Sequence, residues 1–155
     1  RFQNDPDVPA FVGQVATASG GFSGDFGSAQ TSTYVMRSAG TGSRELFLDG
    51  AAQRLSVAPN QSIAFHVQII ARNTVNGESA FYNFEGAARN VAGATALIGA
   101  IAVGAEGEND TAWSASVGAS DATDAIIITG NAGASGDNIR WVATVRTTEV
   151  ALGDL

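Results

Sequence analysis

The stretch IAFHVQIIARNTVNGESAFYNFEGAAR, residues 63–89, decides the fold. Two runs of alternating apolar residues flank Asn76-Gly77, a pair that tolerates the positive φ angles of a two-residue type I′ hairpin turn. With this pair as the loop, Ile69 falls opposite Phe84, and the other pairs on that face are also apolar or small. We therefore predict an antiparallel hairpin with one face buried in a core.

The opposite face of this hairpin is semi-apolar. In the same register Arg72 meets Phe81, and Gln68 meets Glu85. Arginine and aromatic residues without lysine are typical of subunit contacts, although another layer of the same chain is the alternative cover for such a face. The last strand repeats the pattern, so we predict a subunit interface that contains Ile70, Phe81, Val142, Arg140 and Arg146.

Short β-rich segments continue along the chain, separated by Gly, Asn and Asp turns about every ten residues, the spacing of a sandwich or barrel. We predict an all-β, antiparallel β-sandwich of the jelly-roll type. Residues 94–103 are rich in alanine and compete as a helix, but Gly99 and the β-branched residues weaken that alternative. The predicted strands are Thr31–Arg37, Glu45–Asp49, Arg54–Val57, Ile63–Thr74, Glu78–Arg89, Ala96–Val103, Ala112–Val117, Ala125–Thr129 and Asn138–Thr148.

Residues 1–28 differ from the rest of the chain. Proline near the start and glycine at residues 20–27 disfavour both helix and strand. Four phenylalanines in this segment still need burial. We predict an arm or linker over residues 1–28 that packs on a neighbour, and a head domain over residues 29–155. Because the chain begins with Arg1, we expect a processed product or an excised fragment.

Composition excludes several classes of function. The 155 residues carry 8 basic residues, all arginine, against 15 acids, for a net charge of -7. Such a field disfavours nucleic acid and anionic membranes, and no apolar run approaches the roughly 20 residues of a membrane helix. Without cysteine there is neither a disulfide nor a thiolate metal site.

Residues for catalysis are scarce. The chain has one histidine, His66, and neither cysteine nor lysine, so the usual pairs of nucleophile and base lack material. Two carboxylates at a suitable separation are enough to hydrolyse a glycan, and Asp49, Glu85 and Asp110 are embedded among strand-like residues. Nothing in their spacing singles out a pair. We predict a protein that is not an enzyme, with no catalytic residues and no cofactor.

Two binding sites remain as candidates. Glycan binding needs an exposed aromatic platform, and the semi-apolar face offers Phe81 together with Arg72 and His66, whereas the spacing of Trp113 and Trp141 favours the core. The acidic turn with Glu106, Glu108 and Asp110 offers oxygens to a cation, although it lacks the alternation of a known calcium loop.

From about Phe22 to Val150 the sequence resembles the C-terminal head domain of tailed-phage tail-fibre and tail-spike-like virion structural proteins. The order of the matching blocks carries the resemblance more than any one block. These blocks are 29–37 (AQTSTYVMR), 45–50 (ELFLDG), 71–73 (ARN), 78–86 (ESAFYNFEG), 110–113 (DTAW) and 139–150 (IRWVATVRTTEV).

The resemblance implies a homotrimeric head on the surface of a virion, in contact with other virion proteins and directed at a host-surface polysaccharide. It does not identify the binding residues. Two alternatives are a head-fibre or capsid-decorating protein that acts in particle assembly or adhesion, and a glycan-cleaving spike domain.

Overall fold

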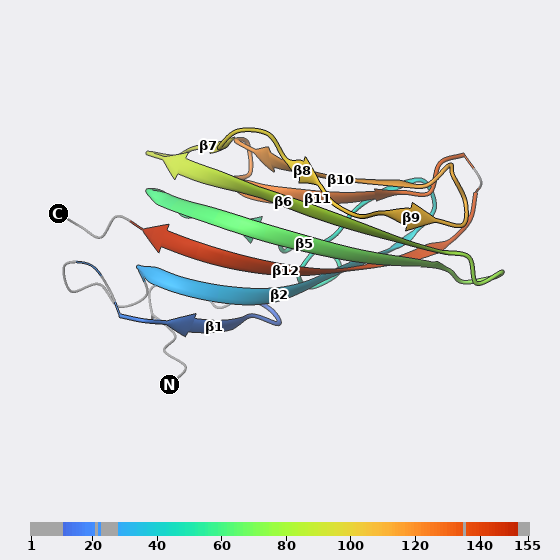
Figure 1. Cartoon of the computed structure of the whole chain (residues 1–155), viewed down its shortest axis with the longest axis horizontal. Coiled ribbons are helices and arrows are strands. Elements are labelled where there is room, and N and C mark those ends of the chain that lie inside the picture. Colours follow the sequence, from blue (N-terminus) through green and yellow to red (C-terminus); the bar gives the residue numbers. More distant parts are fainter. Residues whose placement is uncertain (1–10, 21, 23–27, 135, 152–155) are drawn as a thin grey trace.

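The computed structural model describes residues 11–20, 22, 28–134 and 136–151, and these residues form strands and loops without a helix (Figure 1). No segment in the described part is therefore a candidate for a membrane-spanning helix. The strands are β1 Val15–Ala18, β2 Ala29–Gly40, β3 Ser43–Glu45, β4 Leu55–Ser56, β5 Gln61–Asn73, β6 Ser79–Val91, β7 Ala94–Leu97, β8 Ala102–Val103, β9 Gly107–Glu108, β10 Ser114–Ser120, β11 Ala125–Asn131 and β12 Ile139–Ala151.

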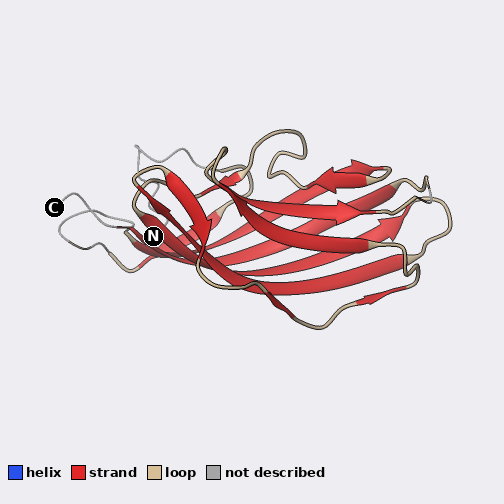
Figure 2. Ribbon diagram, turned by 90° about the horizontal axis from the view of Figure 1, so that it is seen from above, coloured by secondary structure: helices blue, strands red, loops and turns tan. Residues whose placement is uncertain are grey.

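The strands form two antiparallel sheets. The main sheet has the order β1-β2-β12-β5-β6-β7, and the short strands β8 and β9 also pair with β6. The second sheet has the order β10-β11-β3, with β4 on β11. Figure 2 shows the second sheet lying over one face of the main sheet. The prediction of an all-β, antiparallel, sandwich-like fold is confirmed.

The core lies between the two sheets, and the inward-pointing side chains of alternate strand residues fill it. Along β12 the odd-numbered residues from Ile139 to Glu149 are buried, and most of the even-numbered ones are exposed. Trp141 is fully buried, with ring centroids 6.4 Å from Tyr82 and 6.3 Å from Trp113. Both tryptophans therefore belong to the core, as their spacing predicts.

The hairpin of β5 and β6 has the predicted faces but not the predicted register. Ile69 pairs with Tyr82 instead of Phe84, a shift of two residues. The loop is longer than predicted, because the pairing ends where the Asn73 N–H donates to the Glu78 carbonyl at 2.8 Å. Gly77 has φ +79°, but Asn76 is not among the residues with positive φ, so the turn is not type I′.

Turns interrupt two other predicted strands. The segment Ala96–Val103 is divided into the ends of β7 and β8 by a turn at Gly99, whose φ is +77°. In the segment Glu45–Asp49 the ladder stops at Glu45, and Phe47 keeps one bridge to Arg37. In each case a turn occupies residues whose β-branched or aromatic side chains favour a strand.

Part of the predicted arm belongs to the main sheet. Residues 15–18 form β1, which pairs with β2 at the edge, and the Phe11 ring packs against Tyr34 of the same chain, 5.9 Å between centroids. These residues therefore pack on their own head domain. Phe22 is 59% exposed, whereas Phe2 and Phe26 lie outside the described residues.

Candidate functional site

The face of the main sheet that points away from the second sheet is the main candidate surface, and we call it the outer face. It consists of the side chains of β2, β12, β5 and β6 that alternate with the core residues. The ladders align these side chains in rows that cross the sheet. One row consists of Arg37, Val142, Ile70 and Phe81, one residue from each strand.

The centre of the outer face is apolar and open to solvent. Ile70 is 53% exposed, Phe81 42% and Val142 39%, and Val35 lies exposed in the adjacent row. No described segment of the chain covers these residues, so the alternative of a second intrachain layer is wrong for the described part. All five residues of the predicted interface, including Arg140 and Arg146, lie on this face.

The outer face is basic although the chain is acidic. Of the eight arginines five lie in its rows, whereas Glu85 is the one acid among the outer-face positions of β2, β12, β5 and β6. The remaining acids of the described part lie on the core side, in the second sheet or in loops. The net charge of -7 therefore does not describe this face, and excluding anionic partners from net charge alone is too broad. The five arginines are Arg37, Arg72, Arg89, Arg140 and Arg146.

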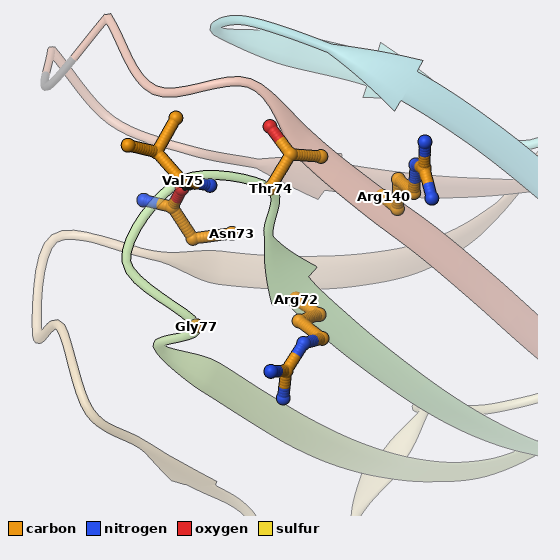
Figure 3. A pocket seen from close by; sticks show the side chains of 6 residues that line it. All are labelled: Arg72, Asn73, Thr74, Val75, Gly77 and Arg140. Carbon is orange, nitrogen blue, oxygen red and sulfur yellow. Dashed lines mark hydrogen bonds between the residues drawn. The ribbon is translucent and has the colours of Figure 1, made fainter.

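A pocket of about 230 Å³ lies where the outer face meets the β5–β6 hairpin loop (Figure 3). Arg72 and Arg140 are direct cross-strand partners at this end of the β5–β12 ladder. The loop is held to β12 by the Thr74 N–H and hydroxyl, which both donate to the Asn138 carbonyl at 3.1 Å. The pocket is lined by Arg72, Asn73, Thr74, Val75, Gly77 and Arg140.

The structure separates the three predicted ligand-binding residues. Arg72 lines the pocket, and Phe81 is exposed in the row next to it. His66 lies between Arg146 and Glu85 in its own row, six residues along β5 from Arg72, which corresponds to roughly 20 Å. Phe81 and Arg72 can therefore contact one ligand together, but His66 belongs to a different part of the face.

The acids considered for catalysis lie on separate elements. Asp49 and Asp110 are in turns, where their Oδ1 atoms accept hydrogen bonds from backbone N–H groups, Asp110 from Ala112 at 2.9 Å. The N–H groups of Ala52, Gln53 and Ala51 lower the pKa of Asp49 to about 2. Glu85 is on β6 and pairs with His66 instead of the predicted Gln68, because of the two-residue shift in register.

Of the three acids predicted to bind a cation, the structure places Asp110 in a different acidic group from Glu106 and Glu108. Asp110 lies with Glu78 and Asp137, and a carboxylate oxygen of each is within 4.8 Å of the others. These half-buried acids come from three separate loops of the described chain, so their proximity was not visible in sequence. Glu106 and Glu108 lie instead near the Tyr82 hydroxyl, whose pKa is raised by burial and by the charge of Glu108.

A buried polar network around Glu149 was not predicted. The Glu149 carboxylate is 6% exposed and accepts hydrogen bonds from the Tyr34 hydroxyl at 3.1 Å and the Gln61 amide at 3.2 Å, and also from Gln30 and Thr147. Burial and then the charge of Glu149 raise the pKa of Tyr34. The alternation of the last strand places residue 149 on the core face, which was the available signal.

No protein-family model matches the chain, and no curated protein matches it significantly. The proposed function therefore rests on the outer face together with the resemblance of the strand blocks.

Proposed function

We propose that this chain is a non-enzymatic virion structural domain, the terminal head of a phage fibre or spike, which takes part in attachment to a host-surface polysaccharide. In this proposal the head is a jelly-roll-like sandwich on the particle surface, and it forms a homotrimer that contacts other virion proteins. The proposal joins the resemblance of the strand blocks to the character of the outer face.

The observation that carries the proposal is the exposed apolar centre of the outer face. Ile70, Phe81 and Val142 lie in one row across three strands, and each is at least 39% exposed. Arginines and aromatics around a non-polar centre, with lysine absent, are the composition of subunit contacts. A head that self-associates through this face leaves its loops and the edge of the face for a ligand.

The proposal separates binding from turnover. The decisive assay is release of reducing ends from host capsule or lipopolysaccharide by the purified chain, with binding to the same polysaccharide measured in parallel. We expect binding without turnover. Turnover that disappears when Asp49, Glu85 and Asp110 are replaced together by their amides would refute the non-enzymatic assignment, because hydrolysis needs an acid and a base or nucleophile at a defined separation.

The position on the particle needs a separate experiment. Antibody raised against the chain should label the tip of the tail when bound to intact particles in the electron microscope. Label over the capsid would refute the fibre assignment and favour the capsid-decorating alternative.

A further inference from the structure

We propose that the pocket at the hairpin end of the outer face binds a carboxylate group, and that the ligand is an acidic sugar residue of the host polysaccharide. This inference rests on the proposed attachment function, and it adds the chemistry of the ligand and its position. Arg72 and Arg140 supply the positive charge of the site (Figure 3).

Two arginines of like charge are paired at the edge of the pocket. Arg72 and Arg140 face each other directly across the β5–β12 ladder, on the same side of the sheet. Like charges in this position destabilise a sheet. Neither guanidinium has a hydrogen bond or ion pair to a described residue, and the ion pair of the described part joins Arg54 and Glu45 elsewhere. An anion between the two arginines would remove the repulsion.

The Asn73 side chain carries a buried hydrogen-bond donor without a partner among the described residues. Asn73 is 2% exposed, and its Oδ1 accepts a hydrogen bond from the Val75 N–H at 2.8 Å, which fixes the orientation of the amide. Its Nδ2 atom is buried without a partner among the described residues. A buried donor of this kind has a cost of about 1–3 kcal/mol unless an acceptor is supplied. Asn73 is one of the residues that line the pocket, and its amide points into the loop, away from the two guanidinium groups (Figure 3).

The hairpin loop contributes by its shape. Gly77 has φ +79°, and a Cβ atom at that position would lie 3.1 Å from the Arg72 guanidinium. Arg72 therefore lies close against the turn, and the glycine leaves space for its guanidinium. Figure 3 shows the Asn73 side chain turned into the loop, with Arg72 and Arg140 on the two strands beside it.

The guanidinium donors of the pocket indicate the class of ligand. Two guanidinium groups offer only donors and positive charge, which suits a planar carboxylate that can accept two parallel hydrogen bonds from arginine. Phosphate is also an anion that arginine binds, and titration with each ligand distinguishes phosphate from a sugar carboxylate.

The test is calorimetric titration of the wild-type chain with an oligogalacturonate and with its methyl ester, which has the same backbone without the charge. Inorganic phosphate is the third titrant. We expect binding of the acid form, no detectable binding of the ester, and about tenfold weaker binding for Arg72→Gln and for Arg140→Gln, which corresponds to one charge-assisted hydrogen bond. Arg89→Gln is the matched control, because it removes the same charge from the far end of the same face.

The possible results are separable. An equal loss in Arg89→Gln would overturn the pocket, because the charge of the whole face would then explain binding. Binding of phosphate without binding of oligogalacturonate would overturn the assignment to a sugar. Binding of the ester that persists in both pocket variants would also overturn the pocket, but it would leave glycan attachment and the trimer intact. No binding to any of these titrants would overturn this inference and leave the trimer test as an independent check on the proposed function.

Discussion

Two buried tyrosines differ in whether their hydroxyl group has a hydrogen-bond partner. Tyr34 and Tyr82 are each 2% exposed, and both rings contact other aromatic rings of the chain. The Tyr34 hydroxyl donates to the Glu149 carboxylate, whereas the Tyr82 hydroxyl has no partner among the described residues. We therefore expect the two hydroxyl groups to contribute differently to stability, although both side chains are buried to the same extent.

This difference gives the first prediction. Tyr34→Phe should lower the free energy of unfolding by about 1.5–3 kcal/mol, because it removes a hydrogen bond to a buried charged group. Tyr82→Phe is the matched control and should be neutral or slightly stabilising, because it removes a buried hydroxyl without a partner. Urea denaturation measures both, and equal losses in the two variants would contradict the hydrogen bonding described for Glu149.

Asp49 gives a prediction for pH. Its pKa is lowered from 3.8 to about 2 by the backbone N–H groups of the turn. A lowered pKa in the folded state means that the ionised form stabilises the fold above the unfolded pKa, and that this stabilisation is lost as the pH falls through about 2. Asp49→Ala should therefore lower the melting temperature at pH 7, and the difference from wild type should shrink between pH 4 and pH 2. A difference that does not change with pH would refute the assignment.

At the scale of elements, the hairpin of β5 and β6 shows what sequence alone can determine. Period-two alternation predicts which side chains share a face, and that assignment is unchanged by a shift of two residues. The pairs themselves depend on the loop, and Asn76-Gly77 suggested a two-residue turn where the chain makes a longer one. The Glu149 network and the Arg72–Arg140 pair each join strands that are far apart in the sequence. They could therefore be identified only from the register of the whole sheet.

Gly77 tests the structure of this loop. Its φ of +79° is strained for any residue with a Cβ atom, and most strained for a β-branched one. Gly77→Val should lower the free energy of unfolding by at least about 1 kcal/mol, whereas Gly77→Asn should have a smaller effect because asparagine tolerates this region. Thermal unfolding of the two variants checks this, and an unchanged midpoint for the valine variant would mean that the loop conformation is different.

Gly130 tests the packing of the second sheet on the main sheet. A Cβ atom there would lie 2.3 Å from Cδ2 of Trp141, a rigid and fully buried ring. Gly130→Ala should cost about 1–3 kcal/mol or more, because the two sheets must move apart to fit it. Gly118→Ala on the neighbouring strand β10 is the control, because nothing lies within 4 Å of the added atom. Equal stability of the two variants in guanidinium denaturation would contradict this account of the core.

At the scale of the whole molecule, the two faces of the main sheet have different roles. One face is covered by the second sheet and forms the core, whereas the other exposes an apolar centre among arginines. Sequence patterning already predicted a semi-apolar second face, because Ile70, Phe81 and Val142 alternate with core residues. The same patterning placed Arg72, Arg140 and Arg146 on this face, whereas the scarcity of acids among its described positions became visible only when the strands were aligned.

The central claim is that the outer face joins copies of this chain, and light scattering on the purified protein at micromolar concentration tests it most directly. We expect a mass of about three chains for wild type and of one chain for Ile70→Glu, because a charge in the apolar centre opposes its burial. Ala64→Glu, on the same strand and face but away from the apolar row, is the control for folding and should remain trimeric. A wild-type monomer would contradict the assignment of the outer face and the proposed trimeric head.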